Sequence, residues 1–94
     1  MPFPNQVPKP FTRENVLNLR PGQMGCYGLF RQGEWVYVGK GDIRQRLLDH
    51  LNGDNPCITL KGPTHWMDVV TAYYDDLERQ LIAELQPTCN RRVG

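Results

Sequence analysis

The sequence lacks the features of a membrane, secreted or polybasic protein. No apolar run in its 94 residues approaches the ~20 residues that span a bilayer. The first ten residues, MPFPNQVPKP, contain no apolar stretch of the kind that a signal peptide needs. Eleven Lys and Arg face ten Asp and Glu, so charge alone cannot carry binding to a nucleic acid. We therefore expect a globular cytoplasmic protein with no membrane partner.

Cysteine is scarce as well. The chain has three cysteines, which are widely spaced and form no CxxC pair. An odd count in this pattern argues against a disulfide framework and against a zinc finger. We expect three reduced thiols, most of them buried, as is usual inside cells. A zinc or redox protein built on cysteine and histidine is the least favoured function.

Prolines and glycines divide the chain into an arm and one small domain. Residues 1–22 carry four of the eight prolines within their first ten positions, and we expect an extended arm that ends in a short helix. Residues 23–94 are expected to form the compact domain. The pattern predicts strands over 23–31, 34–39 and 65–72, helices over 42–52 and from Asp75 or Asp76 to Gln86, and a loop over 53–64. The predicted fold is α/β of the α+β type, a small three-stranded antiparallel sheet flanked by helices.

Glu78 does not fit a purely structural interpretation of the last helix. Helical spacing puts its carboxylate on the apolar face, between Leu85 and Ile82. Burial of an unpaired carboxylate costs several kcal/mol or forces its protonation. The first turn of a helix also favours a carboxylate, and a carboxylate beside a cleft can bind a hard cation. Helical spacing alone does not decide between a carboxylate that stabilises the first turn and a carboxylate that binds a cation.

Arg46 and His50 lie four residues apart on one edge of the predicted 42–52 helix. Both side chains can carry positive charge, so they stabilise each other poorly and suit an anionic ligand. The alternative is an ordinary solvated helix flank. The spacing identifies a candidate anion site without deciding between the two.

Two tyrosines stand one on each strand of the predicted hairpin. Glycines flank Tyr27 and Tyr37, and glycine inside a strand marks the close approach of a ligand or another backbone. Lys40 and Gly41 directly precede the helix start, where backbone N–H groups suit a phosphate. The alternative is a pair of half-buried sheet tyrosines with wet hydroxyls.

Together these residues resemble the GIY-YIG nuclease domain, and the chain is identified as a small stand-alone member. The family's paired motifs match Gly25-Cys26-Tyr27 and Tyr37-Val38-Gly39, with the two tyrosines ten residues apart. The family's later helix pattern, E-x-x-L-I-x-x-x-x-P-x-x-N, matches ERQLIAELQPTCN from Glu78 to Asn90. Arg46 and His50 in RQRLLDHL match the family's Arg and His, and Lys40 follows the second motif as in many members. The resemblance covers residues 23–92.

The chain departs from the family pattern at two points. Cys26 replaces Ile in the first motif, an exchange between apolar residues inside a strand. The segment between Gly39 and Arg46 is one residue shorter than in many members, which puts the reach of Arg46 in doubt.

The resemblance implies hydrolysis of DNA phosphodiester bonds with one Mg²⁺ or Mn²⁺ ion. Glu78 would be the sole protein ligand of the metal. Arg46 would bridge phosphate oxygens, with Lys40 beside it. The general base is left open among Tyr27, Tyr37 and His50.

Substrate binding is assigned to Gly39, Arg44 and Asn90, although Asn90 is rather expected to hold the C-terminal turn against the sheet. Lys40, Arg44 and Arg46 would form a basic cluster, which is extended by Arg31, Arg79, Arg91 and Arg92. So few phosphate contacts give weak, salt-sensitive binding with little sequence specificity.

A single metal site cuts one strand at a time, so nicking is the expected activity. A protein partner or a homodimer would have to supply the specificity for DNA. The alternative function is a catalytically silent module of the same fold that binds nucleic acid or a repair partner. The complete set of Tyr, Arg, His and Glu favours the enzyme, since a structural remnant needs no carboxylate on an apolar face.

Overall fold

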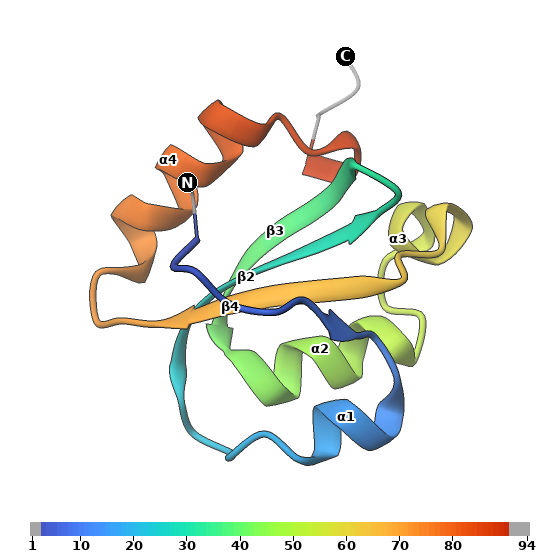
Figure 1. The fold of residues 1–94 in the computed structure, drawn as a ribbon, viewed down its shortest axis with the longest axis horizontal. Coiled ribbons are helices and arrows are strands. Elements are labelled where there is room, and N and C mark those ends of the chain that lie inside the picture. Colours follow the sequence, from blue (N-terminus) through green and yellow to red (C-terminus); the bar gives the residue numbers. More distant parts are fainter. Residues whose placement is uncertain (1–2, 91–94) are drawn as a thin grey trace.

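The computed structural model describes residues 3–90 and consists of a central sheet with helices on both faces (Figure 1). Its elements in chain order are β1 (Lys9–Pro10), α1 (Arg13–Leu17), β2 (Met24–Arg31), β3 (Glu34–Asp42), α2 (Ile43–Leu51), α3 (Pro56–Lys61), β4 (His65–Val70), α4 (Tyr74–Leu85) and the 3-10 helix η1 (Thr88–Asn90). No helix among these residues is long and apolar enough to cross a bilayer.

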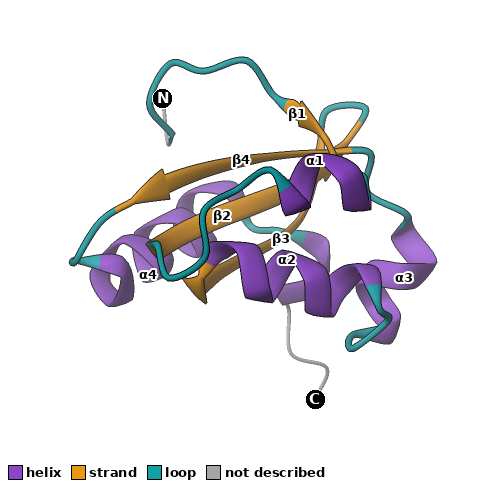
Figure 2. Ribbon diagram, turned by 90° about the horizontal axis from the view of Figure 1, so that it is seen from below, coloured by secondary structure: helices purple, strands orange, loops and turns teal. Residues whose placement is uncertain are grey.

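The sheet has the strand order β1-β4-β2-β3, and all of its pairs are antiparallel. Strands β2, β3 and β4 are the three that the sequence predicts. The fourth strand, β1, comes from the arm and pairs only two residues with β4, because prolines at 8 and 10 lack the N–H groups of a longer ladder. Figure 2 shows β1 beside β4 and β3 at the opposite edge of the sheet.

The arm packs onto the domain rather than extending away from it. Phe3 is 1% exposed and Val16 is fully buried, each within one of the two hydrophobic clusters of the core. These contacts tie residues 3–22 to the domain, and the division after residue 22 stays a prediction.

The predicted helices are confirmed, and their caps explain where they begin. The Asp42 carboxylate accepts a hydrogen bond from the backbone N–H of Gln45 at the start of α2. Thr12 caps α1 in the same way. Helix α4 begins after Tyr73, earlier than the sequence predicts, so Asp75 and Asp76 lie in its first turn rather than at the cap.

The predicted loop over 53–64 is wrong in its central part, which forms α3. The Asn55 side chain accepts hydrogen bonds from the backbone N–H groups of Cys57 and Ile58. Pro56 occupies the first turn, and Gly62 ends the helix in the left-handed conformation. The prolines and glycines that indicate a loop are here the beginning and end of a short helix.

Two of the three cysteines form a disulfide, so the prediction of three reduced thiols is wrong. Cys57 in α3 is bonded to Cys89 in η1, with their Cα atoms 5.7 Å apart. Cys26 is the free, buried cysteine. The partners lie 32 residues apart in the sequence, and only the formation of α3 brings them together.

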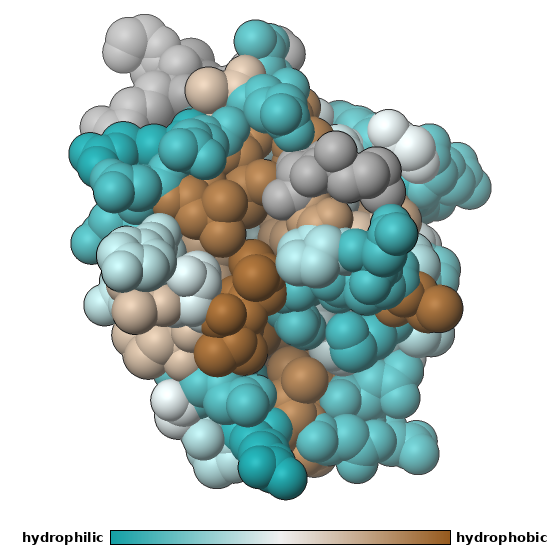
Figure 3. All heavy atoms as spheres, turned by 60° about the vertical axis from the view of Figure 1, so that its left-hand side comes forward, coloured by the Kyte–Doolittle hydropathy of each residue, from teal (hydrophilic) through white to brown (hydrophobic). Residues whose placement is uncertain are grey.

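The sheet separates two apolar layers. Figure 1 shows α1 and α2 on one side of the sheet and α4 on the other. The larger cluster, which includes Tyr27, Leu47 and Trp66, lies on the α2 side, and the smaller one, with Cys26 and Leu81, lies under α4. Figure 3 shows that apolar atoms stay visible in a strip on the α4 side of the molecule. The sheet is therefore packed against apolar side chains on both faces.

Candidate active site

Tyr27 and His50 form the buried centre of the site. The Tyr27 hydroxyl lies 2.6 Å from Nε2 of His50, and Tyr27 is 0% and His50 4% exposed. Alternation along β2 points Tyr27 toward α2, whose last turn carries His50. Burial raises the pKa of Tyr27 far above its usual value, the nearby Tyr37 adds to this, and Arg46 opposes it.

Gly39 makes room for this contact. It lies opposite Tyr27 in the β2–β3 ladder, and a Cβ at position 39 would overlap the Tyr27 hydroxyl. The same Cβ would stand 2.8 Å from Cε2 of Tyr37. The glycine of the second motif is therefore required by the packing of both tyrosine rings.

Tyr37 lies beside the pair but is less enclosed. It is half-buried, and its ring centroid is 5.1 Å from that of His50 and 6.3 Å from that of Tyr27. Burial raises the pKa of Tyr37, and the nearby Arg46 guanidinium acts to lower this pKa. Of the two motif tyrosines, Tyr37 is the one with access to solvent, because Tyr27 is 0% exposed.

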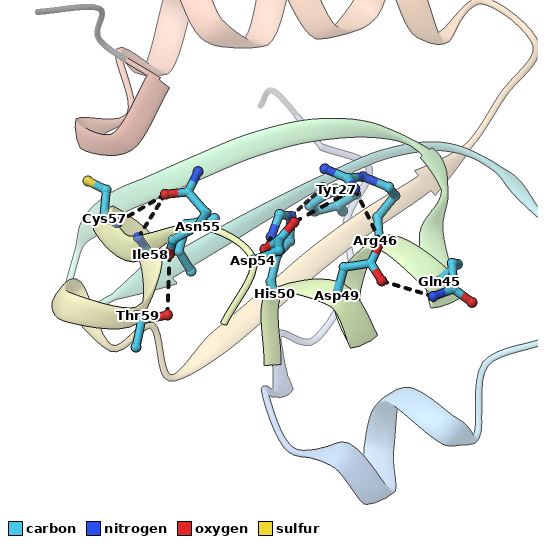
Figure 4. Close-up of polar contacts among 10 residues, drawn as sticks. All are labelled: Tyr27, Gln45, Arg46, Asp49, His50, Asp54, Asn55, Cys57, Ile58 and Thr59. Atoms are coloured by element: carbon cyan, nitrogen blue, oxygen red, sulfur yellow. Dashed lines mark hydrogen bonds and ion pairs between the residues drawn. The ribbon is translucent and has the colours of Figure 1, made fainter. Parts of the chain in front are cut away.

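Arg46 lies over the tyrosines and is held by acidic residues. Its Nη1 is 3.2 Å from the Asp49 carboxylate and 3.8 Å from that of Asp54. Gly41 has φ +123°, and a Cβ there would be 3.4 Å from Cγ of Arg46. The Arg46 guanidinium lies beside the Tyr27 side chain (Figure 4).

Asp54 is a member of the site that the sequence interpretation misses. Its Oδ1 lies 2.7 Å from Nδ1 of His50, so the imidazole is bonded at both nitrogens (Figure 4). Burial lowers the pKa of His50 even though Asp54 acts to raise it, so the ring is neutral near pH 7. In the sequence, the contact could have been suspected because Asp54 is a carboxylate four residues after His50. Asn52-Gly53 ends the helix between the two residues, however, so helical spacing does not predict the contact. Tyr27, Arg46, His50 and Asp54 are called the α2 cluster below.

The second group of candidate residues is the α4 cluster, which consists of Lys40, Asp75 and Glu78. Nζ of Lys40 lies 2.5 Å from the Asp75 carboxylate and 3.5 Å from that of Glu78. The hydrogen bond that Lys40 donates to the Asp75 carboxylate is the main reason that the pKa of Lys40 is raised. The side chains of Lys40 and Asp75 are 41% and 65% exposed, whereas that of Glu78 is 19% exposed.

The donor set of the α4 cluster fits a hard cation that keeps most of its water. Within residues 3–90 no group of three or more His, Cys, Asp or Glu side chains is arranged to hold a metal. Mg²⁺ is commonly bound through one or two carboxylates plus water and substrate phosphate. The partly exposed Glu78 carboxylate, paired only loosely with Lys40, offers such an oxygen ligand.

The residues assigned to substrate binding lie in different surroundings. Arg44 projects from α2 about 160° away from Arg46, since successive residues of a helix turn by about 100°. Its Nε is buried without a hydrogen-bond partner. Asn90 accepts a hydrogen bond from the N–H of Val38 and donates one to the Val38 carbonyl, which fixes η1 against β3. Arg91 and Arg92 lie outside the described residues.

Comparison with known proteins finds no matching family model and no matching curated protein sequence. Solved structures do match. The GIY-YIG N-terminal endonuclease domain of UvrC from Thermotoga maritima, as a tyrosine point mutant bound to its catalytic divalent cation, is 26% identical with a TM-score of 0.74, covering 85% of this chain and 94% of that chain. The form bound to magnesium is 25% identical with a TM-score of 0.73, covering 84% and 94%. The resemblance to GIY-YIG nuclease domains is confirmed, and the chain has the fold of that family.

Proposed function

We propose that the chain is a metal-dependent endonuclease that hydrolyses DNA phosphodiester bonds, nicking one strand at a time with little sequence specificity. One observation carries the proposal. A tyrosine–histidine–arginine cluster and a lysine–carboxylate cluster flank the same edge strand, β3, in the fold of a domain whose solved forms bind a catalytic divalent cation. This arrangement pairs an anion site with a cation site.

Glu78 would hold one Mg²⁺ or Mn²⁺ ion as the single protein ligand. When bound, the ion polarises a phosphate oxygen and offsets negative charge in the transition state. Lys40 is 3.5 Å from Glu78, and an ion pair whose lysine side chain is 41% exposed is weak enough to rearrange. Lys40 is then free to contact a phosphate.

Arg46 would bind the scissile phosphate. Its guanidinium can form two parallel hydrogen bonds to phosphate oxygens, an interaction that a lysine does not match. Both of its carboxylate partners are partly exposed, at 33% and 34% of the side chain, so an incoming phosphate can replace them. Gly39 and Arg44 are proposed to support substrate binding, and Asn90 to hold the turn.

The attacking water needs a base, and Tyr27, Tyr37 and His50 are the candidates. The pKa values of both tyrosines are raised by burial, so neither becomes a phenolate unaided. A tyrosine can act here only if a neighbour takes its own proton. His50 is the base that lies within hydrogen-bond distance of Tyr27.

Plasmid nicking tests the proposed function. Purified protein is incubated with supercoiled plasmid at low salt with Mg²⁺ or Mn²⁺, and nicked circles are expected. Glu78→Ala should abolish nicking but leave DNA binding intact in a gel-shift assay. Glu84→Ala is the matched control, because this exposed glutamate lies on the same helix and should leave nicking unchanged.

The silent module of the same fold is the competing function. It would bind DNA, including branched DNA, without cleaving it under any metal condition, and Glu78→Ala would change nothing but stability. This outcome would overturn the nuclease proposal.

We also propose that a protein partner or a homodimer supplies specificity for DNA. Each phosphate contact contributes about −0.9 to the slope of log affinity against log salt, so a few basic residues bind weakly. Sedimentation with and without a DNA duplex would detect the homodimer.

A cytoplasmic location is proposed as well, and it bears on the disulfide. Reducing conditions inside most cells keep cysteines as thiols. In that compartment the Cys57–Cys89 disulfide would be exposed to reduction. Alkylation of thiols before cell lysis, followed by mass spectrometry, would measure the reduced fraction.

A further inference from the structure

We infer that Asp54 is a positioning residue that fixes the tautomer of His50 and so makes Tyr27 part of a proton relay. The inference rests on the proposed nuclease function for its catalytic meaning. Its structural basis is a continuous chain of two hydrogen bonds, from Asp54 to Nδ1 of His50 at 2.7 Å and from Nε2 to the Tyr27 hydroxyl at 2.6 Å.

The direction of each hydrogen bond follows from the chemistry of its ends. An ionised carboxylate only accepts hydrogen bonds, so Nδ1 of His50 must carry the hydrogen that Asp54 accepts. A neutral imidazole has one N–H, which leaves Nε2 without a hydrogen. Nε2 therefore accepts, and the Tyr27 hydroxyl donates.

Burial makes this order rigid. The His50 side chain is 1% exposed, and Tyr27 is 0% exposed, so water cannot substitute for either hydrogen bond. The Asp54 side chain is 34% exposed and reaches solvent. The row of hydrogen bonds thus runs from Asp54 at the surface, through the buried imidazole of His50, to the buried phenol of Tyr27.

The relay moves protons without leaving a free phenolate. When Arg46 turns to a phosphate, the Tyr27 oxygen is uncovered and accepts a proton from the attacking water. In the same event the original hydroxyl proton of Tyr27 passes to Nε2 of His50. The products are hydroxide attacking phosphorus, a neutral Tyr27 and an imidazolium paired with Asp54. Among residues 3–90 no base lies in hydrogen-bond contact with the Tyr37 hydroxyl, which favours Tyr27 as the base.

Nitrogen-15 NMR of the histidine rings tests the tautomer without any need for cleavage. In wild-type protein at pH 7, we expect His50 to carry its hydrogen on Nδ1 and none on Nε2. Asp54→Asn should lose this preference, because an amide can donate to Nδ1 as well as accept from it. A hydrogen on Nε2 in wild-type protein would overturn the relay.

Cleavage kinetics test the catalytic part. Asp54→Asn should lower kcat about 10- to 100-fold, the loss found when a metal-binding histidine loses its carboxylate partner, with little change in KM for DNA. Asp54→Glu should recover part of the rate, because it keeps a carboxylate.

Asp49→Asn is the matched control. It removes the nearer carboxylate partner of Arg46 at 3.2 Å but keeps both hydrogen bonds of the His50 ring. An equal loss of kcat in this variant would show that Asp54 acts through Arg46 and would overturn the inference.

The two proposals fail in different ways. If wild-type protein cleaves no DNA, the nuclease proposal fails. The NMR measurement of the His50 ring nitrogens still tests the hydrogen-bond geometry of the relay in that case. If wild-type protein cleaves DNA and Asp54→Asn cleaves at the same rate, only the relay is overturned.

Discussion

The Tyr27–His50 centre of the α2 cluster is closed and hydrogen-bonded, whereas Lys40 and Asp75 of the α4 cluster form an open ion pair at the surface. The His50 side chain is 1% exposed, while those of Lys40 and Asp75 are 41% and 65% exposed. Buried polar groups are costly to leave unpaired, so the α2 cluster is fixed by the fold. Exposed ion pairs contribute little to stability and can exchange partners. One half of the site is thus organised in advance, and the other half can rearrange around a cation and a phosphate.

The largest expected effect comes from filling the space that Gly39 leaves. Gly39→Ala would force apart the rings of Tyr27 and Tyr37 and should lower the free energy of unfolding by about 3 kcal/mol. Urea unfolding followed by tryptophan fluorescence measures the loss. Gly33→Asn is the control, because Gly33 lies in an exposed turn with φ +81°, which Asn tolerates. An unchanged midpoint for Gly39→Ala would contradict the tight packing of the α2 cluster.

A smaller effect is expected from the protonation of His50. The ring faces Tyr27, Tyr37, Arg46, Asp49 and Asp54. Because burial lowers its pKa in the folded state, the unfolded chain takes up this proton first as the pH falls. The stability contributed by the neutral ring is therefore complete above about pH 6.5 and is lost as the pH falls from there to the lower folded pKa.

The measurement is the free energy of unfolding at several pH values between 7.5 and 5. Wild-type protein should lose stability more steeply than His50→Gln, by at most about 1.4 kcal/mol per pH unit for one proton. His65→Gln, which changes the other histidine of the chain, should keep the wild-type slope. Equal slopes for wild type and His50→Gln would mean that the ring is not held neutral.

The smallest effect on the fold is expected in the α4 cluster. Lys40→Ala removes an exposed cation and should leave the unfolding midpoint within error of wild type. The same change frees Glu78 from a positive charge 3.5 Å away, so Mn²⁺ should bind about two- to fivefold more tightly. Titration followed by Mn²⁺ paramagnetic resonance measures the affinity, with Lys61→Ala as a distant control. Weaker Mn²⁺ binding would place the cation elsewhere than at Glu78.

Local sequence signals predict the framework of this fold well. Helix α2 follows from the Asp42 cap and a regular apolar stripe, and the hairpin follows from two strand-like runs around Gln32-Gly33. The GIY-YIG motifs also predict the fold that the structural neighbours share. These features depend on residues that are close in sequence, which is why the sequence alone identifies them.

Features that join distant segments are not predictable in the same way. The Cys57–Cys89 bond depends on α3, and α3 is hidden because Asn55-Pro56 and Gly62 are equally typical of a loop. Asp54 lies four residues after His50, a spacing that also occurs on a helix, but Asn52-Gly53 ends the helix between them. Helical periodicity therefore could not be relied on to predict this contact.

Asn90 has a consequence for how copies of this chain can meet. Strand β3 forms one edge of the sheet, and an open edge can pair with a strand of another molecule. The Asn90 amide bonds to both the N–H and the carbonyl of Val38, as the backbone of an added strand would. One side chain therefore closes this rung of the sheet. A second copy cannot continue the sheet through Val38 without first displacing Asn90.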